Sequence, residues 1–244
     1  MSNKTPLSAM RLKRLVKNYF DGLGHLIFSN LCFHCNNELT FGEDYLCWLC
    51  WEGLDRTYFE EACAPTNLDQ LFWGRAKIQY CCAPYYYSKD SVCSSLIGAL
   101  KYKSKAPLGI YLGKHLAQVF NKHPLRNVDA LLALPIHSKK KFQRGYNQSE
   151  LIAKGLSLEW RIPLIKGAAH KNKNTKSQTQ NDRFERWENV KNTFEINTQQ
   201  MVFNHILIVD DVITTGATLE AFCQSIHRLA PDIQISLLSF AFTK

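Results

Sequence analysis

Two adjacent carboxylates near the C-terminus could bind the hydroxyl groups of a sugar. Asp210 and Asp211 follow the apolar run ILIV, which predicts a strand buried on both faces of a sheet. We therefore expect both carboxylates at the carboxyl end of a central strand, where open α/β sheets bind ligands. Two carboxylates there can accept hydrogen bonds from a vicinal diol, such as the 2′- and 3′-hydroxyls of ribose, or help place a divalent cation.

The turn that follows the carboxylates suits a phosphate group. It opens a predicted helix, whose first backbone N–H groups can bind an anion, and Gly216 allows a ligand to approach the backbone closely. Because diol and phosphate are neighbours in ribose 5-phosphate, one ligand could occupy both parts. The alternative is that the sequence has no ligand here: the two carboxylates simply end a strand and the Thr-Thr-Gly turn simply caps a helix. That interpretation requires both features to occur next to each other by coincidence. The predicted phosphate-binding residues are Thr214, Thr215, Gly216, Ala217 and Thr218.

The stretch ILIVDDVITTGATLEA resembles the signature with which type I phosphoribosyltransferases bind phosphoribosyl pyrophosphate (PRPP). A Walker B strand also ends in carboxylates, but it needs a partner loop GxxxxGK[ST], and residues 109–115 have the wrong spacing. The resemblance implies that Asp210 and Asp211 hold the ribose hydroxyls and that the threonine turn holds the 5′-phosphate. It also implies Mg²⁺, which accompanies PRPP and bridges the leaving pyrophosphate.

A pyrophosphate loop after an earlier strand is a further implication of the resemblance. Here the apolar run DALLALPI is followed by HSKKKFQRGYNQSE, and a basic, glycine-containing turn before a helix suits a polyanion. We predict that Lys141, Arg144 and the backbone around Gly145 bind the pyrophosphate. For the lysines, a solvated surface is an equal alternative.

A long polar stretch, KNKNTKSQTQNDRFERWENV, precedes the carboxylate strand. It is too polar and too long for a buried connection, so it predicts a mobile loop that could close over substrate, with an ordinary surface loop as the alternative. Its candidate residues are Thr175, Gln178, Arg186 and Asn189. The candidate catalytic residues are Asp210, Asp211, Arg144 and Arg186.

Four cysteines near the N-terminus have the spacing of a metal site. Cys32 and Cys35 form one C-x2-C pair, and Cys47 and Cys50 form a second pair eleven residues later. Four thiolates can hold one Zn²⁺ tetrahedrally and leave no open position, which predicts a structural zinc ribbon; four unrelated buried cysteines are the alternative. His34 is expected to be a bystander. The remaining cysteines lack paired spacing and are expected to be small buried hydrophobic residues: Cys63, Cys81, Cys82, Cys93 and Cys223.

The elements that must position these groups alternate along the second part of the chain. Apolar runs predict strands at residues 78–87, 129–136, 205–211 and 233–242. Helical periodicity predicts helices at residues 92–100, with Asp90 as N-cap, at 108–120, from Gln148 onward, and at 219–229. Strands separated by helices predict an α/β fold with a mostly parallel sheet flanked by helices, as in type I phosphoribosyltransferases.

Three regions are expected in the 244 residues. The spacing of apolar residues in 1–26 predicts a basic amphipathic helix that docks on the rest of the protein. The zinc-ribbon module is expected at residues 27–65, and the phosphoribosyltransferase-like domain at residues 75–244. The polar stretch at residues 66–70 is interpreted as a linker.

The charge and the composition limit the class of partner and the compartment. A formal charge of +9 favours polyanions such as nucleic acid, although solvated faces explain single basic clusters equally well. No run approaches the roughly 18 apolar residues of a membrane span, and no cleavable leader opens the chain. We therefore expect a cytoplasmic protein with reduced cysteines and no transmembrane segment.

The combination of a four-cysteine ribbon and a PRPP signature resembles the ComF family, also called ComFC or GntX-like proteins. Three further segments carry the resemblance: LIGALKYK, LPIHSKKKFQRGYNQSE and NTKSQTQNDRFERWENVKNTF. Two departures are a single pair of cysteine knuckles, which implies one zinc, and lysine or asparagine where the family often has arginine before Thr175. The resemblance implies a role in natural competence, the uptake and handling of external DNA, and names no phosphoribosyl acceptor.

Three functional hypotheses follow. In the first, a competence-associated protein with a PRPP site contacts single-stranded DNA or DNA-handling partners, in the cytoplasm or peripherally at the inner membrane face. In the second, the protein is an active phosphoribosyltransferase on an unidentified acceptor. In the third, the zinc ribbon is a scaffold for a competence helicase or a recombination mediator.

Overall fold

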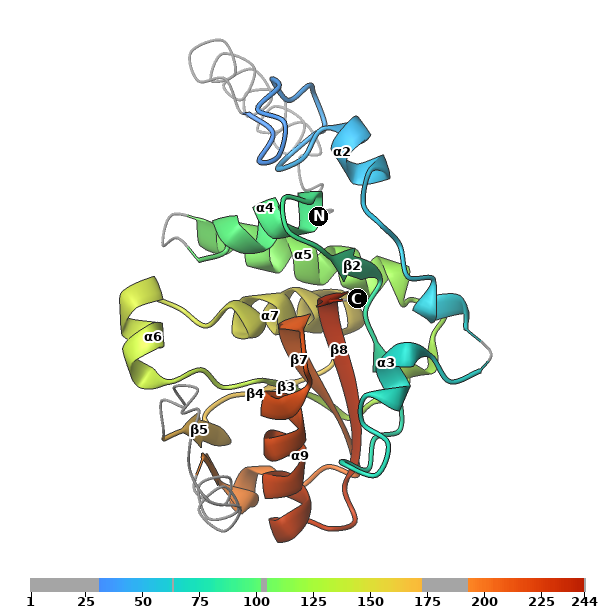
Figure 1. The fold of residues 1–244 in the computed structure, drawn as a ribbon. Helices are drawn as coiled ribbons and strands as arrows, with labels where there is room; N and C mark the ends of the chain where they lie inside the picture. Colours follow the sequence, from blue (N-terminus) through green and yellow to red (C-terminus); the bar gives the residue numbers. More distant parts are fainter. Residues whose placement is uncertain (1–30, 63, 102–104, 173–192, 244) are drawn as a thin grey trace, which may run out of the picture. The chain divides into compact units, whose positions relative to one another are not determined.

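The computed structural model describes residues 31–62, 64–101, 105–172 and 193–243 (Figure 1). The chain divides between Gly53 and Leu54 into two compact units. The helix predicted at residues 1–26 lies outside the described residues. So do five residues singled out in the sequence: Cys63, Thr175, Gln178, Arg186 and Asn189.

The described part of the first unit is a small cysteine-rich module with one short helix, α2 (Trp48–Glu52). Its first knuckle closes where the backbone N–H of Cys32 donates to the carbonyl of Asn37 at 2.9 Å. Glu43 fixes the second knuckle, because its carboxylate accepts the backbone N–H groups of Thr40 at 2.7 Å and of Trp48 at 2.6 Å. These backbone donors lower the pKa of Glu43.

The second unit is built on a six-stranded sheet in which every strand pair is parallel, so the predicted mostly parallel sheet is confirmed. The strand order is β1-β8-β7-β3-β4, and β2 also pairs with β8. The central strands are apolar runs buried on both faces, as expected where helices cover both sides. The strands are β1 (Cys81–Cys82), β2 (Tyr85–Tyr87), β3 (Ala130–Ala133), β4 (Leu164–Ile165), β7 (His205–Ile213) and β8 (Gln234–Thr243).

Helices cover both faces of this sheet (Figure 1). Ile206 and Ile208 of β7 pack in one core with Phe222 of α9, and alternation along the strand turns Leu207 and Val209 to the other face. There α7 packs on β3 and β7 and also against α5. The helices are α3 (Asn67–Gln70), α4 (Val92–Ala99), α5 (Ala106–Val119), α6 (Ser138–Arg144), α7 (Gln148–Trp160) and α9 (Ala217–Leu229).

Short elements complete the unit. An antiparallel pair, β5 (Ala169–Lys171) and β6 (Phe194–Ile196), flanks residues 173–192 in the sequence. The 3-10 helices are η1 (Phe59–Glu61), η3 (Pro124–Asn127) and η4 (Thr198–Gln200).

Two glycines let α5 and α7 approach closely. A Cβ built on Gly113 would lie 2.0 Å from the carbonyl oxygen of Ile152, and one on Gly155 would lie 2.2 Å from that of Ile110. Larger side chains at either position would force the helices apart. The close packing holds the start of α7 in place, and the candidate site uses that start.

Several sequence predictions differ from the structure in detail. The strand predicted at residues 78–87 is two short strands, because Pro84 between them has no N–H for the ladder. Helix α4 is capped by Ser91, whose hydroxyl accepts the N–H of Ser94 at 3.1 Å, while Asp90 adopts a left-handed conformation. The polar turn expected after β3 contains helix α6.

The segment interpreted as a linker is part of the α/β unit. Thr66 and Asp69 form a reciprocal capping box that starts α3. Leu68 is fully buried and Phe72 nearly so, and both belong to the core shared with α9. The polar residues of this segment cap a helix, and its apolar residues anchor it.

Among the described residues, none of the helices is long and apolar enough to cross a lipid bilayer.

Candidate functional site

The two carboxylates stand where the central strand extends past its neighbour. Strand β3 pairs with β7 only as far as Ala133, opposite Val209, and the N–H of Leu134 then donates to the Val209 carbonyl at 2.9 Å. From Asp210 onward β7 pairs with β8 alone. Asp210 and Asp211 therefore lie inside β7, three and two residues before its end, but beyond the carboxyl end of β3.

Asp210 is held by donors from two elements. Its Oδ1 accepts the hydroxyl of Ser149, in the first turn of α7, at 2.9 Å and the backbone N–H of Asp211 at 2.9 Å. Burial first, and then the neighbouring carboxylate of Asp211, raise the pKa of Asp210 well above its usual range. The pair therefore resembles two acids sharing one site, in which one holds its proton more tightly.

The threonine turn leads from β7 into the N-terminus of α9, as predicted. Gly216 is the N-cap residue with φ of 69°, a left-handed conformation that glycine adopts without strain. Gly216 is buried, whereas Thr214, Thr215, Ala217 and Thr218 are exposed to solvent. The 13-residue helix thus presents its unpaired N–H groups among exposed hydroxyl-bearing residues, directly after the carboxylates.

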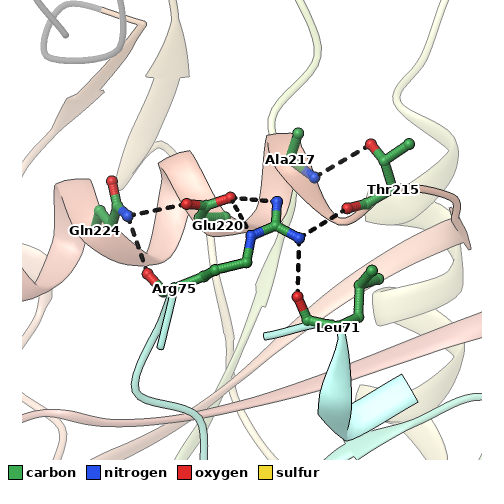
Figure 2. A network of polar contacts seen from close by, with 6 residues as sticks. All are labelled: Leu71, Arg75, Thr215, Ala217, Glu220 and Gln224. Atoms are coloured by element: carbon green, nitrogen blue, oxygen red, sulfur yellow. Dashed lines mark hydrogen bonds and ion pairs between the residues drawn. The ribbon is translucent and has the colours of Figure 1, made fainter. Parts of the chain in front are cut away.

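Arg75, which the sequence did not identify as a site residue, hydrogen-bonds to the backbone of this turn (Figure 2). Nη1 of Arg75 donates to the carbonyl of Thr215 at 3.4 Å and to that of Leu71 at 2.9 Å, while its Nε donates to Glu220 at 2.9 Å. Gln224 closes the network by donating to the Arg75 carbonyl at 3.0 Å. Glu220 lies in the first turn of α9, so Arg75 balances a negative charge close to the predicted phosphate position.

The same segment packs directly under the turn. A Cβ added to Gly216 would lie 2.9 Å from Cζ of Phe72 and 3.0 Å from Cδ2 of Leu71. Gly216 is therefore required both by its backbone conformation and by its neighbours.

The predicted pyrophosphate residues lie on and after α6. Lys141 forms an ion pair with Glu150 at 3.4 Å, and Arg144 donates to Oε1 of Gln148 at 2.8 Å. Gly145 ends the helix in a left-handed conformation, with φ of 84°. The basic side chains thus stand beside the start of α7, the same helix start that holds Asp210.

Lys171, the last residue of β5, is a further lysine that interacts with the carboxylate of Asp210. Burial first, and then the charge of Lys140, lower the pKa of Lys171, whereas Asp210 acts in the opposite direction. Its ammonium group lies 5.3 Å from the ring centre of Phe194. The backbone of Lys171 also forms an isolated parallel β-bridge with His137, which follows β3. In the sequence Lys171 is only the first residue of the long polar stretch and was not assigned to the site, because its interaction with Asp210 arises only in the fold.

The four cysteines of the first unit come together as predicted. Their sulfur atoms lie within 4.8 Å of one another, and those of Cys35 and Cys47 are 3.7 Å apart. Tetrahedral zinc with Zn–S bonds of about 2.3 Å requires sulfurs about 3.8 Å apart, so the donor set fits this metal. Burial opposes ionisation of Cys32, but backbone N–H groups from Cys35, Cys47 and His34 outweigh it and lower its pKa to about 6.

The other described cysteines are buried, as expected of small hydrophobic residues: Cys81, Cys82, Cys93 and Cys223. Burial raises the pKa of Cys93 and of Cys223 to about 12, so both stay protonated thiols.

Comparison with known proteins finds relatives across most of the chain. Competence protein F of Haemophilus influenzae is 24% identical over 230 residues, which cover 85% of this chain and 96% of that protein. DNA utilization protein YhgH of Escherichia coli K12 is 26% identical over 215 residues, covering 83% and 93% respectively. These relatives confirm the resemblance to the ComF family that the motifs indicated.

Two other comparisons are less informative. No protein-family profile matches the chain. Among solved structures, orotate phosphoribosyltransferase from Aeropyrum pernix covers 70% of this chain and 78% of its own, with 14% identity and a TM-score of 0.29.

Proposed function

We propose that this chain binds PRPP or a related phosphoribosyl compound and acts in the uptake and use of DNA during competence. The observation that carries the first part is the joining of Asp210 and Asp211 to the exposed N-terminus of α9 by one short turn. The printed names of the relatives, a competence protein and a DNA utilization protein, support the second part.

The site offers a partner for each part of the ligand. Asp210 and Asp211 accept hydrogen bonds from the ribose hydroxyls, and the turn from Thr214 to Thr218 surrounds the 5′-phosphate. Lys141, Arg144 and the backbone at Gly145 face the pyrophosphate. Mg²⁺, which the carboxylate oxygens suit, supplies charge neutralisation of the pyrophosphate when bound.

The residues of this chain also favour departure of the pyrophosphate. Loss of this group leaves positive charge on the ribose ring, and the carboxylates of β7 lie where they stabilise it. Ser149 keeps the Asp210 carboxylate in one orientation during this change.

A titration of purified protein with PRPP and Mg²⁺, with pyrophosphate release followed in parallel, tests the proposal. We expect saturable binding that the double variant Asp210→Asn, Asp211→Asn abolishes. If the double variant binds PRPP as tightly as the wild type, the two carboxylates do not contact PRPP, and the proposal is wrong.

Single-stranded DNA is the proposed macromolecular ligand. The net charge of +9 supports it, because cationic side chains that displace counterions from DNA supply most non-specific affinity. The affinity of the protein for a labelled oligonucleotide is expected to fall steeply between about 50 and 200 mM salt. If the protein does not bind the oligonucleotide at low salt, the proposal that it contacts single-stranded DNA is contradicted. Adding PRPP to the same titration shows whether the two ligands are coupled.

The cysteine module is proposed to bind one structural Zn²⁺ and to dock a protein partner, such as a competence helicase or a recombination mediator. Large apolar side chains on the module are exposed: Phe41 is 94%, Trp48 67% and Leu49 76% exposed. Such exposure is typical of an interaction surface. Capture of a purified helicase by wild-type protein and its loss in Trp48→Ala would support docking, and unchanged capture would contradict it.

A further inference from the structure

A cavity of about 360 Å³ lies beside β1, at the edge of the parallel sheet. It is bounded by the segment from η1 to α3, by the chain that leads from α3 into β1, and by the turn after α5. Its lining, among the described residues, contains none of those assigned to the PRPP site. Small-molecule sites have volumes of roughly 300–1,000 Å³, so this cavity suits a ligand of one or two rings.

Aromatic and aliphatic side chains form part of the cavity wall. Phe59, Phe72 and Ile78 line it, and the two phenylalanines are buried in the core. Trp73 also lines the cavity but is 62% exposed, so its indole is placed to cover a ligand that enters from solvent. Such walls suit the faces of a flat ring.

His123 gives the cavity one defined hydrogen-bond donor. Its Nδ1 accepts the backbone N–H of Leu125 at 3.1 Å, and an imidazole nitrogen that accepts a hydrogen bond carries no proton. Burial lowers the pKa of His123 and outweighs the opposing effect of Glu60. The ring is therefore neutral at pH 7, and its proton lies on Nε2.

This donor has a poor partner within the protein. Nε2 of His123 lies 3.9 Å from Sγ of Cys82, and a thiol sulfur is a weak acceptor. Edge-to-face contacts with Tyr80 and Phe120, at 5.5 and 5.6 Å between ring centres, hold the imidazole in place. A ligand with a ring nitrogen would offer Nε2 a stronger acceptor than the thiol does.

Asp69 supplies the cavity with a negative charge. Its Oδ2 accepts the backbone N–H and the hydroxyl of Thr66, both at 2.7 Å, in the capping box of α3. A carboxylate offers about four acceptor positions, so this one can accept further N–H groups. Burial first, and then the charge of Asp69, raise the pKa of Cys82, which lines the same cavity.

These charges select against an anionic ligand. The described lining residues include no lysine and no arginine, and His123 is neutral. A phosphate group would meet no cation here and would lie near the carboxylate of Asp69, which is unfavourable. The ligand chemistry therefore differs from that of the PRPP site, where the start of α9 and Arg144 favour negative charge.

We propose that this cavity is a second ligand site, which binds an uncharged, flat nitrogen heterocycle that carries an amino group. The amino N–H groups donate to Asp69, and a neighbouring ring nitrogen accepts the Nε2–H of His123. The aromatic side chains cover the faces of the ring. This assignment goes beyond the proposed function and does not depend on it, because the two sites share no residue.

Calorimetric titration of adenine and of purine into the full-length protein, without PRPP, tests the assignment. Adenine carries an amino group beside a ring nitrogen, whereas purine has the same rings without the amino group. We expect saturable binding of adenine and an affinity for purine at least about tenfold lower, because a hydrogen bond to a charged group is lost. Absence of adenine binding, or equal affinity for the two compounds, would overturn the assignment.

Two variants locate the bound ring. His123→Asn removes the Nε2–H donor, and the asparagine oxygen can still accept the Leu125 N–H that caps η3. Ala76→Leu reduces the cavity volume and leaves His123 unchanged. Each variant is expected to lower the affinity for adenine about tenfold. Unchanged affinity in either variant would place the ring elsewhere and contradict the proposal.

His227→Asn is the matched control for the loss of an imidazole. His227 does not line the cavity, and its Nε2 lies 3.1 Å from the carbonyl oxygen of Ile233. The control should bind adenine as the wild type does. An equal loss of affinity in His227→Asn and His123→Asn would assign the effect to the fold and overturn the proposed contact.

The double variant Asp210→Asn, Asp211→Asn distinguishes this proposal from the proposed function. It should lose PRPP binding and keep adenine binding within about twofold of the wild type. Loss of adenine binding in this variant would place adenine at the sugar-phosphate site and overturn the second site. PRPP binding that persists in the double variant would contradict the proposed function alone.

Discussion

The hydroxyl of Ser149 donates a 2.9 Å hydrogen bond to Oδ1 of Asp210 and so joins the first turn of α7 to the central strand β7. Its neighbours are engaged in similar links, since Gln148 donates to the carbonyl of Leu100 at 3.2 Å and Asn147 to that of Leu134. Three consecutive buried polar side chains therefore anchor one helix start to three other segments. The proposed site is built around this anchor.

Replacing Ser149 with alanine is expected to weaken PRPP binding about five- to tenfold. The substitution leaves the Asp210 carboxylate with one donor fewer, so its orientation is less well defined, and a hydrogen bond to a charged group contributes about 1.5–3 kcal/mol at most. Isothermal titration with PRPP and Mg²⁺ measures the change. Ser157→Ala is the matched control, because Ser157 lies on the same helix and donates at 2.7 Å to the carbonyl of Ile162, far along α7 from the carboxylates. An equal loss in both variants would assign the effect to helix stability.

Asp210→Asn is expected to stabilise the protein at neutral pH while removing PRPP binding. Burial and Asp211 raise the folded-state pKa of Asp210 above the unfolded value of about 3.9, so between the two values the folded state holds more protons. The contribution of Asp210 to the free energy of unfolding therefore falls as pH rises through this window, by about 1.4 kcal/mol for each unit of elevation.

Urea unfolding between about pH 4 and pH 8 in magnesium-free buffer measures this dependence. The difference in unfolding free energy between the Asp210→Asn variant and the wild type should grow in favour of the variant as pH rises. A difference that stays constant over this range would contradict the raised pKa of Asp210.

Arg75→Ala is expected to lower PRPP affinity about two- to fivefold, although Arg75 does not face the ligand in the proposed site. Without the guanidinium, the carboxylate of Glu220 presents an unbalanced negative charge in the first turn of α9, where charges are worth about 0.3–1 kcal/mol. Adding Glu220→Gln to the same chain removes that charge and should restore most of the affinity. Such a rescue separates electrostatics from folding, since a damaged fold would not be repaired by a second deletion. Arg126→Ala, which loses a surface contact with Asn121, should have no effect.

The central strands and the motifs on them could be predicted because their evidence is local. The four residues ILIV (206–209) are all apolar, so they had to be buried, and the carboxylates that follow them had to lie at the carboxyl end of the sheet. Helix α6 was missed because its sequence, SKKKFQR, has no apolar periodicity and none of its residues is buried. Its ends are defined instead by the cap at His137 and by the left-handed Gly145.

The rest of the site depends on contacts between distant parts of the sequence. Arg75 and Glu220 are 145 residues apart, and Ser149 and Asp210 are 61 apart. In the sequence, Ser149 reads as an ordinary residue in the first turn of a helix, and Arg75 as a charge after a polar stretch. The signal that could have drawn attention to Asn147, Gln148 and Ser149 was three successive polar residues at the start of a helix whose apolar face must be buried.

Zinc content is expected to be one ion per chain, bound through all four sulfurs of the cysteine module. Cys47→Ser removes one thiolate from a set whose atoms lie within 4.8 Å, so the remaining three should hold zinc much more weakly. Metal analysis of dialysed protein measures the content. Cys93→Ser, in the α/β unit, should keep its zinc, and a variant at Cys47 that also keeps one ion would contradict the four-sulfur site.

Gly216→Ala is expected to destabilise the protein more than Gly74→Ala, although both glycines have φ of 69°. The two substitutions share the same backbone strain, about 1–2 kcal/mol for a left-handed residue with a Cβ. A Cβ at Gly74 meets no atom within 4 Å, whereas one at Gly216 would lie 2.9 Å from the ring of Phe72. Overpacking at Gly216 should therefore add about 1–3 kcal/mol to the loss, which chemical denaturation can resolve. The same clash would displace the turn that begins α9, so PRPP affinity should fall in Gly216→Ala and hold in Gly74→Ala. Equal stability losses in the two variants would show that the turn yields to the added methyl group, and the rigid phosphate site proposed here would then lose its structural basis.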